Sequence, residues 1–373
     1  MIKRCFGEKA LSRGLRIGID GRSLQGARTG VGRYVFELCR QLDSLLPDAT
    51  FFVYSQLPVE LPGNSERWVL RLEPSKFWRR LKSVLWIKLR AYRLCCEDRL
   101  DVYWGGALFL PLLPAYVKTV VTVHDLNHRI CPTSMGTMHL WAHKLFFGHD
   151  ERRADAVVAN SQGTASRLIQ YGYRRADAVV TPAISPDFAP QSEETVDACK
   201  RRYGIDVPYI LAVATWEPRK NLELLIRTYV KMKRDGLLES QKLVLAGGKG
   251  WKDEKLVTLL AGDGREHVLA LGYVEDDDLK ALYTGAELFV LPSLYEGYGI
   301  PVIEALACGS RVVASDIPEI REAGGEAAIY ISPDEAGIRE GIMKALTLAK
   351  PYAPMTLPTW NEGAATLVRM FAK

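Results

Sequence analysis

Short apolar runs alternate with amphipathic segments along most of the chain. In the first half, these runs have the length and the branched side chains of buried strands, and helical spacing lies between several of them, as at residues 33–44 and 161–171. The first-half runs are residues 15–19, 51–54, 68–72, 102–104, 117–123, 156–159 and 178–181. The second half repeats the pattern at residues 209–213, 243–246, 268–271, 288–291, 312–314 and 328–331. Strands that alternate with helices predict an α/β protein with doubly wound parallel sheets.

A segment at residues 181–194 separates the two series of strands. It holds three prolines and no periodicity, which is typical of a domain boundary. We predict one domain over residues 1–185, a second over 186–350, and a C-terminal segment over 351–373 with a helix at 360–371. The length of 373 residues agrees with two domains of roughly 150 residues each.

Composition and charge narrow the class of protein. Lys and Arg number 49 against 44 Asp and Glu, and the net charge of +5 is too small to indicate a nucleic-acid partner. The seven cysteines contain no Cys-x-x-Cys, which favours reduced thiols in the cytoplasm over disulfides or a zinc site.

No apolar run of eighteen residues occurs, and residues 1–14 lack the apolar core of a signal peptide, so we expect no membrane span. His139 and His143 lack a third ligand at suitable spacing, so we expect neither a metal nor another cofactor.

The most informative stretch is residues 295–309, between the predicted strands 288–291 and 312–314. Pro301 suits a first helical turn and Gly309 suits a helix end, so the stretch predicts a strand, a loop, a helix and a second parallel strand. The loop Glu296-Gly-Tyr-Gly then lies at the carboxyl edge of the sheet, where α/β proteins bind ligands. The N-terminus of the helix offers unpaired N–H groups to an anion. A tight turn beside two surface glutamates, Glu296 and Glu304, is the alternative interpretation.

Three further strand ends carry candidate ligand-binding groups. A glycine-rich segment that includes Gly30 and Gly32 follows the first strand, and His124 follows the strand at 117–123. Arg219 and Lys220 precede the helix predicted at 222–233, where cations oppose the helix dipole unless an anion binds beside them. The alternatives are a flexible loop for the glycines, an ordinary buried histidine, and an exposed loop for the two cations.

Residues 76–93 are the most basic stretch, with seven Lys and Arg and no acid. Apolar side chains at helical spacing predict one amphipathic helix; they are Phe77, Leu81, Leu85, Leu89 and Tyr92. Two interpretations remain open. The apolar stripe packs on the core behind a solvated basic face, or the helix docks on an anionic membrane surface.

The string Glu-Gly-x-Gly-x-Pro-x-x-Glu-Ala-x-Ala-x-Gly at residues 296–309 resembles the donor-site signature of retaining GT-B glycosyltransferases of family 4. The resemblance extends over most of the chain. It implies two Rossmann-like domains facing across a cleft, the first on the acceptor side and the second binding a nucleotide sugar, with the terminal helix packing back on the first. The strings Glu-Pro-Arg-Lys-Asn at 217–221 and Glu-Gly-Tyr-Gly-Ile-Pro at 296–301 look most like those of bacterial mannosyl- and rhamnosyltransferases.

The resemblance also implies a reaction. A hexose would move with retention from a nucleotide diphosphate donor, with GDP-mannose or a GDP-deoxyhexose as the leading donor, to a glycan or polyprenyl-linked acceptor. The setting would be O-antigen, lipopolysaccharide or other surface polysaccharide assembly, in the cytoplasm or peripherally on the inner face of the membrane. A UDP-sugar-dependent transferase of the same family, a sugar epimerase or phosphorylase of the same architecture, and a non-catalytic GT-B partner subunit are the alternatives.

The resemblance assigns roles to individual residues. His124 would contact the transferred sugar, Arg219 and Lys220 would neutralise the departing diphosphate, and Glu296 would hold the sugar hydroxyls; these four are the predicted catalytic residues. Many members carry an arginine five positions before the lysine, where this chain has Thr215, so Arg219 would provide that charge. The predicted donor-binding residues are Gly30, Gly32, Tyr273, Val274, Gly297, Tyr298, Gly299, Ile300 and Glu304, with Tyr273 and Val274 along the nucleobase and Glu304 at the ribose hydroxyls.

Overall fold

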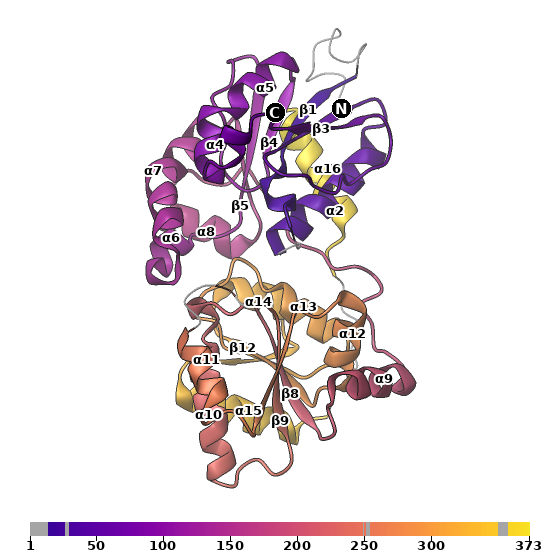
Figure 1. Cartoon of the computed structure of the whole chain (residues 1–373), viewed down its shortest axis with the longest axis vertical. Helices are drawn as coiled ribbons and strands as arrows, with labels where there is room; N and C mark the ends of the chain where they lie inside the picture. The colour runs from indigo at the N-terminus through magenta and orange to yellow at the C-terminus, as the bar shows by residue number, and fades with distance from the viewer. Residues whose placement is uncertain (1–13, 27–29, 249, 251–253, 350–356) are drawn as a thin grey trace. The chain divides into compact units, whose positions relative to one another are not determined.

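The computed structural model describes residues 14–26, 30–248, 250, 254–349 and 357–373. The chain divides into two compact units (Figure 1). Unit 1 comprises Met1–His128, Thr137–Ala183 and Pro358–Lys373, and unit 2 comprises Arg129–Gly136 and Ile184–Leu357.

Unit 1 is built on a seven-stranded sheet in the order β3-β2-β1-β4-β5-β6-β7. All the pairings between neighbouring strands are parallel. The strands are β1 (Arg16–Asp20), β2 (Thr50–Ser55), β3 (Trp68–Leu72), β4 (Val102–Gly105), β5 (Lys118–Val123), β6 (Ala156–Ala159) and β7 (Ala178–Val179). Every apolar run predicted in this half overlaps one of them. The doubly wound parallel sheet predicted from the sequence is therefore confirmed for unit 1.

The helices of unit 1 cover this sheet. They are α2 (Gly30–Leu45), α3 (Lys76–Arg79), α4 (Ser83–Leu89), α5 (Ala91–Glu97), α7 (Thr137–Arg153), α8 (Gln162–Gln170) and α16 (Trp360–Phe371), with a 3₁₀ turn η2 (Gly21–Leu24) after β1. The short turn α6 (Asn127–Ile130) is divided between the two units, and η3 (Pro132–Ser134) belongs to unit 2. The C-terminal helix α16 packs against α2, and both helices contribute to one hydrophobic cluster with the strands. A capping box between Thr359 and Glu362 fixes the start of α16.

The basic segment at residues 76–93 is not the single helix that its spacing predicts. It forms α3, α4 and the start of α5, with breaks at residues 80–82 and at Arg90. The first break has a tertiary cause, because the amide of Gln56 donates to the carbonyl oxygens of Trp78, Arg79 and Leu81. These carbonyls end α3 by bonding to a side chain from the end of β2 instead of continuing the helix. The prediction of one continuous helix is therefore wrong.

The predicted apolar stripe of this segment also faces the other way. Val84, Trp86 and Ile87 are buried, and all three lie outside the predicted stripe. Four members of the stripe are exposed instead: Phe77, Leu85, Leu89 and Tyr92. Breaking the helix rotates α4 relative to α3, so a spacing rule that assumes one continuous helix identifies the wrong face as the buried one.

Unit 2 is built on a six-stranded sheet in the order β10-β9-β8-β11-β12-β13, with parallel pairings. Its strands are β8 (Tyr209–Val213), β9 (Lys242–Ala246), β10 (Val268–Gly272), β11 (Leu288–Leu291), β12 (Val312–Ser315) and β13 (Ala328–Ile331). Its helices are α9 (Glu193–Tyr203), α10 (Leu222–Arg234), α11 (Glu254–Ala261), α12 (Asp276–Gly285), α13 (Ile300–Ala307), α14 (Pro318–Gly324) and α15 (Glu335–Thr347), with a 3₁₀ turn η4 (Pro218–Lys220).

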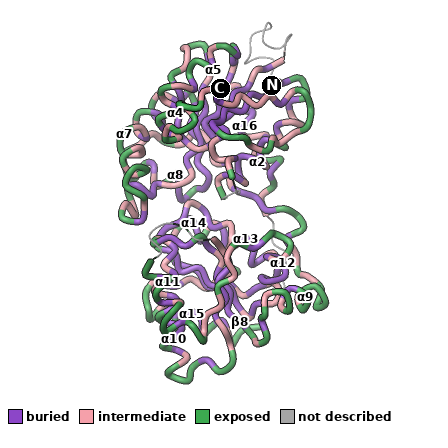
Figure 2. Tube along the Cα trace, viewed as in Figure 1, coloured by how far each residue is buried: buried purple, intermediate pink, exposed green. Residues whose placement is uncertain are grey.

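The two faces of the unit 2 sheet carry two separate cores. Leu211, Val244 and Phe289 belong to a cluster that includes α9, α12, α13 and α14, whereas Ile210, Leu243 and Leu288 belong to one that includes α10, α11 and α15. This alternation by single residues is what a strand buried on both faces requires. Figure 2 shows the buried strands enclosed by helices whose outer faces are exposed.

Both sheets reverse their strand order at one place. In unit 1 this occurs between β1 and β4, and in unit 2 between β8 and β11. At such a switch point the loops leave the carboxyl ends of neighbouring strands in opposite directions, and ligands bind in the resulting crevice. Most of the candidate residues found in the sequence follow these strands or their immediate neighbours, whereas Tyr273 and Val274 follow β10 at the edge of the unit 2 sheet.

Candidate functional site

The loop after β8 brings two cations to the switch point of unit 2. Pro218 starts the turn η4, and Asn221 ends it in a left-handed conformation with φ of 58°, which asparagine tolerates better than most residues. The Asn221 amide donates to the carbonyl oxygens of Pro292 (3.2 Å) and Pro333 (2.9 Å). The turn that carries Arg219 and Lys220 is therefore fastened to the segment that follows β11.

The loop after β11 provides the other side of the site. The Leu294 N–H donates to the carbonyl oxygen of Arg219 at 2.8 Å, which joins the two loops directly. Gly299 has φ of 120°, a conformation that residues with a Cβ rarely adopt, and it precedes the first residue of α13. Pro301 lies in the first turn of α13, as predicted. The loop Glu296-Gly-Tyr-Gly thus connects a buried strand to the amide-rich N-terminus of a helix.

The structure brings Arg219, Lys220 and Glu296 into direct contact. Lys220 Nζ lies 2.6 Å from Glu296 Oε1, and Arg219 Nη1 lies 2.7 Å from Glu296 Oε2. Arg219 also pairs with Glu217 through Nη2 at 2.7 Å, and Ser293 Oγ donates to Glu296 Oε1 at 2.7 Å. Three of the predicted catalytic residues are therefore one hydrogen-bonded cluster, to which the structure adds Glu217 and Ser293.

Burial and pairing set the ionisation of this cluster. Burial alone would raise the pKa of Glu296, but Lys220 and Arg219 overcome it and hold that pKa at about 2. Burial, and then the neighbouring Arg219, lower the pKa of Lys220. Burial raises the pKa of Glu217 against the attraction of Arg219. Glu296 is consequently an ionised group that only accepts hydrogen bonds, and it is a poor base near neutral pH.

The cluster has the chemistry of a prepared anion site. Two cations contact Glu296 in the loop that leads into α13, and cations and helix N-termini both attract phosphate. Two carboxylates offset the cations before any anion arrives, so the cations are held in place without an unpaired buried charge. An incoming diphosphate would compete with Glu217 and Glu296 for the same donors.

The remaining predicted residues of unit 2 lie around this cluster in different settings. Glu304 is buried on α13 and accepts from the Tyr283 hydroxyl at 3.0 Å. The side chains of Val274 and Tyr298 pack in the hydrophobic core, so they present only backbone atoms to a ligand. Tyr273 is exposed after β10, and Ile300 packs partly against the core. Gly297 and Gly299 flank Tyr298 in the loop before α13.

Three predicted residues belong to unit 1. Gly30 and Gly32 lie in the first turn of α2, which begins at Gly30, three residues before the predicted start, so they are helical and not part of a loop; residues 27–29 of that segment lie outside the described residues. His124 follows β5, and its Nε2 lies 2.7 Å from the carbonyl oxygen of Gly106. The ring of Tyr34 meets the His124 ring edge-on at 4.9 Å. Burial lowers the pKa of His124, so the ring is neutral near neutral pH.

The sequence analysis missed three residues of the unit 2 site. Glu217 and Asn221 stand within the string that carries Arg219 and Lys220, and Ser293 comes two residues after β11. A search for polar residues within a few positions of each strand's carboxyl end would have included them. Thr215, which stands five positions before Lys220, is exposed. Among the residues that the structure describes, no three His, Cys, Asp or Glu side chains are grouped to hold a metal ion.

The comparisons with known proteins cover both units. The family model "Glycosyltransferase Family 4" matches residues 28–184, and "Glycosyl transferases group 1" matches residues 199–356. O-antigen chain mannosyltransferase B of Escherichia coli is 30% identical over 82% of this chain and 84% of its own length. Serotype-specific mannosyltransferase WbdA of Escherichia coli is 36% identical over 62% of this chain, which spans only 29% of WbdA.

Solved structures show the same fold. WaaG, a glycosyltransferase involved in lipopolysaccharide biosynthesis, matches with a TM-score of 0.67 over 96% of this chain and 95% of its own at 16% identity. Two Rossmann-like units with parallel sheets, the glycine-rich loop before α13 and these relatives lead to one conclusion. The chain belongs to glycosyltransferase family 4 and has the GT-B fold.

Proposed function

We propose that this glycosyltransferase moves a hexose, mannose or a deoxyhexose, from a GDP-sugar to a glycan or polyprenyl-linked acceptor with retention of configuration. The observation that carries the proposal is the Arg219–Lys220–Glu296 cluster at the switch point of unit 2. O-antigen chain mannosyltransferase B of Escherichia coli is 30% identical to this chain. Its named activity supports mannose as the sugar and bacterial O-antigen or another surface polysaccharide as the product.

The charged cluster suits departure of a nucleoside diphosphate. When the bond between the sugar and the diphosphate breaks, negative charge grows on the phosphate oxygens, and fixed cations stabilise this charge most in a site that excludes water. Arg219 and Lys220 would bond to those oxygens. Glu296, released from the cations in the same step, would accept hydrogen bonds from the sugar hydroxyls. Glu304 would accept from the ribose hydroxyls, and no metal ion is needed to balance the diphosphate.

The ionisation of the site supports retention. An inverting transferase needs a general base on the acceptor hydroxyl. In the proposed reaction Glu296 is occupied by the sugar hydroxyls on the donor side, and burial makes His124 a weaker base than an ordinary imidazole. In the proposed reaction the sugar's anomeric carbon separates from the phosphate oxygen, and the acceptor oxygen bonds to that carbon on the same face. The departing phosphate takes the acceptor's proton.

Product stereochemistry and donor binding test this proposal together. With a GDP-α-linked sugar, proton NMR of the new anomeric centre should show an α-glycoside, and a β-glycoside would overturn retention. Thermal-shift measurements should show GDP stabilising the protein more than UDP or ADP. A larger shift with UDP would favour a UDP-sugar donor, and no shift with any nucleoside diphosphate would favour a non-catalytic partner subunit. Turnover of the nucleotide sugar without an acceptor would favour an epimerase or a phosphorylase.

We also propose that unit 1 contacts the anionic inner face of the cytoplasmic membrane, where a polyprenyl-linked acceptor lies. The supporting residues are exposed apolar and basic side chains on α3, α4, α5 and α7 and in the break between α3 and α4. Phe77, Leu89, Trp141 and Leu145 are exposed by 72%, 63%, 65% and 68%. The exposed cations among them are Lys76, Arg80, Lys82, Arg93 and Lys144, and the sequence has no acid at residues 76–96 or 137–149. No helix in the described part of the chain is long and apolar enough to span a bilayer.

Not every cation of the basic segment is available to a membrane. Lys88 is bound to Asp150, Arg90 to Glu73, and Arg79 donates to the Glu73 carbonyl oxygen. Each remaining Lys or Arg adds on the order of 1 kcal/mol of attraction to an anionic surface, and salt weakens that attraction.

Flotation with anionic liposomes tests the membrane contact. The protein should float with the lipid at low salt, and the pair of changes Trp141→Ser and Leu145→Ser should reduce the floating fraction. The matched control is Leu57→Ser with Ile169→Ser, two exposed apolar residues of unit 1 outside α3, α4 and α7. Absence of the wild-type protein from the lipid fraction, or equal loss in both pairs, would refute the membrane contact at this surface.

A further inference from the structure

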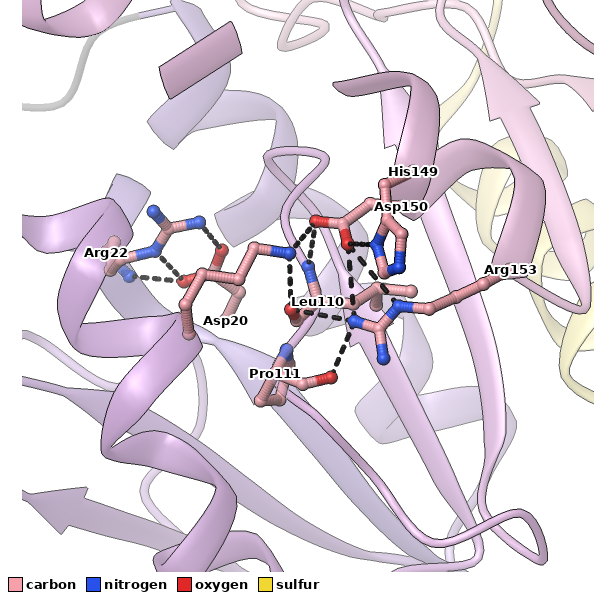
Figure 3. A network of polar contacts seen from close by, with 8 residues as sticks. Asp20, Arg22, Leu110, Pro111, His149, Asp150 and Arg153 are labelled. Carbon is pink, nitrogen blue, oxygen red and sulfur yellow. Dashed lines mark hydrogen bonds and ion pairs between the residues drawn. The ribbon is translucent and has the colours of Figure 1, made fainter. Parts of the chain in front are cut away.

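A network of buried charges in unit 1 holds the loop that follows β4. This β4 loop, residues 106–111, has five of its six residues fully buried or nearly so, and buried backbone groups need partners. Asp150 accepts from the Leu110 N–H at 3.0 Å, and Lys88 donates to the Leu110 carbonyl oxygen at 2.9 Å and to Asp150. Arg153 donates to the carbonyl oxygens of Leu110 (2.9 Å) and Pro111 (2.7 Å). Figure 3 shows this network around Leu110 and Pro111.

The loop is held in a conformation that it would not adopt alone. Leu108 has φ of 76°, in the left-handed region that is unfavourable for a residue with a branched side chain. Such a conformation persists only where the surroundings enforce it. The ion pairs of α4 and α7 hold the loop in this conformation through their contacts with Leu110 and Pro111 at its C-terminal end.

Gly106, the first residue of the same loop, holds the His124 ring through a hydrogen bond. A carbonyl oxygen only accepts hydrogen bonds, so the Gly106 carbonyl at 2.7 Å requires that His124 Nε2 carry the hydrogen. In the neutral ring, Nδ1 then keeps its lone pair and can only accept a hydrogen bond. A Cβ on Gly106 would lie 2.8 Å from Val35, so the backbone at Gly106 has no room to shift toward α2.

We infer that Lys88, Asp150 and Arg153 are positioning residues for His124, acting through the β4 loop to set which ring nitrogen carries the hydrogen and which one can accept a hydrogen bond from the transferred sugar. The inference rests on the proposed function only for the sugar contact of His124. Buried ion pairs are often no more stabilising than apolar packing, which agrees with a role in geometry. Lys88 has a pKa lowered to about 8, because its burial outweighs the attraction of Asp150, so its charge is present at neutral pH and declines in more alkaline solution.

Nitrogen NMR of histidine-labelled protein tests the link directly, without needing activity. The chain has six histidines, and the His124 signals are those lost in His124→Phe. We expect wild-type His124 in the single Nε2–H form. Arg153→Gln removes two bonds to the loop, and Asp150→Asn removes the charge at its centre. In both variants His124 should become a mixture of tautomers, and turnover should fall roughly 10- to 100-fold with the donor KM little changed, the range seen for residues that orient metal-binding histidines.

Two matched controls separate positioning from loss of stability. Asp98 is also a buried carboxylate of unit 1, and its side chain accepts hydrogen bonds from Arg71 on β3 and from Tyr54 on β2. The Arg71 and Arg153 side chains are similarly exposed, at 31% and 26%. Asp98→Asn and Arg71→Gln should lower the melting temperature yet leave the His124 tautomer and turnover unchanged.

The possible results are distinguishable. If Asp150→Asn fails to fold, the more exposed Arg153→Gln decides the question. Folded Arg153→Gln protein with the wild-type His124 spectrum would overturn the inference. Full turnover in His124→Phe would instead refute the sugar contact in the proposed function, and the spectra would still show whether the network sets the tautomer.

Discussion

Replacing Lys220 by methionine removes one charge from the centre of the unit 2 cluster and keeps most of the side-chain volume. Lys220 is buried, and its Nζ lies 2.6 Å from Glu296. If Lys220 stabilises the departing diphosphate, Lys220→Met should lower turnover by roughly 10²–10³, the range for losing one preorganised charge-stabilising group. Arg219→Ala should act in the same direction.

The cost in stability should be smaller than for most buried ion pairs. The pKa of Glu296 falls from an ordinary 4.5 to about 2, which corresponds to about 3 kcal/mol at 1.36 kcal/mol per unit. Lys220 shares this effect with Arg219, and Ser293 also bonds to Glu296. We therefore expect Lys220→Met to lower the free energy of unfolding by about 1–2 kcal/mol, below the 3–5 kcal/mol typical of removing a sole partner.

Turnover and unfolding by chemical denaturant should be measured for Lys220→Met and for a matched control variant. Lys280 is equally buried in unit 2 and pairs with Asp187 (2.6 Å) and Asp277 (2.8 Å), away from the cluster. Lys280→Met should reduce stability while turnover and nucleotide affinity remain normal. Lys220→Met protein that folds and turns over at nearly the wild-type rate would refute the diphosphate role of this lysine.

Three further predictions concern the same unit. Turnover should survive excess EDTA, because Arg219 and Lys220 offset the diphosphate charge, and strict dependence on magnesium or manganese would contradict the proposed site. Glu296 has a depressed pKa in the folded state, so its pairing stabilises the protein above pH 4.5 and is lost as the pH falls toward 2. The difference in unfolding free energy between wild type and Glu296→Gln should accordingly narrow over that range in urea titrations. Gly299→Ala forces a Cβ into φ of 120°, 3.4 Å from Ala323, and should lower unfolding free energy by about 1–3 kcal/mol and weaken GDP binding; unchanged melting and GDP affinity would contradict this.

The sequence was sufficient for the fold because buried parallel strands are apolar on both faces. Every predicted run overlaps a strand, and Pro301 and Gly309 mark the ends of α13 by local rules. Local rules failed at residues 76–93, because the Gln56 amide, some twenty residues away, takes the carbonyl oxygens that a continuous helix needs. They also misplaced the start of α2, since glycines are weak helix formers and Gly30 and Gly32 were assigned to a loop.

Some contacts between the site residues could be predicted from the sequence, and others could not. Arg219 and Lys220 follow β8, and Glu296 follows β11, so their contact depends on β8 and β11 being neighbours in the sheet. The doubly wound pattern makes it predictable that these two strands are neighbours. Asp150 lies inside a helix with no unusual spacing, and its partners Lys88 and Leu110 are 62 and 40 residues away. Long-range contacts of this kind leave no periodic signal in a single sequence.

The two switch points use buried charge in the same way. In unit 2, Glu296 keeps Arg219 and Lys220 in place, and in unit 1, Asp150 keeps Lys88 and Arg153 against the β4 loop. Apolar side chains of similar volume would often stabilise a core as well or better, since charges lose hydration on burial. Apolar packing, however, fixes neither a cation against Glu296 in the loop before α13 nor a carbonyl oxygen against His124 Nε2. The buried charges are therefore best explained by the positions they impose on the groups that we propose meet the substrate.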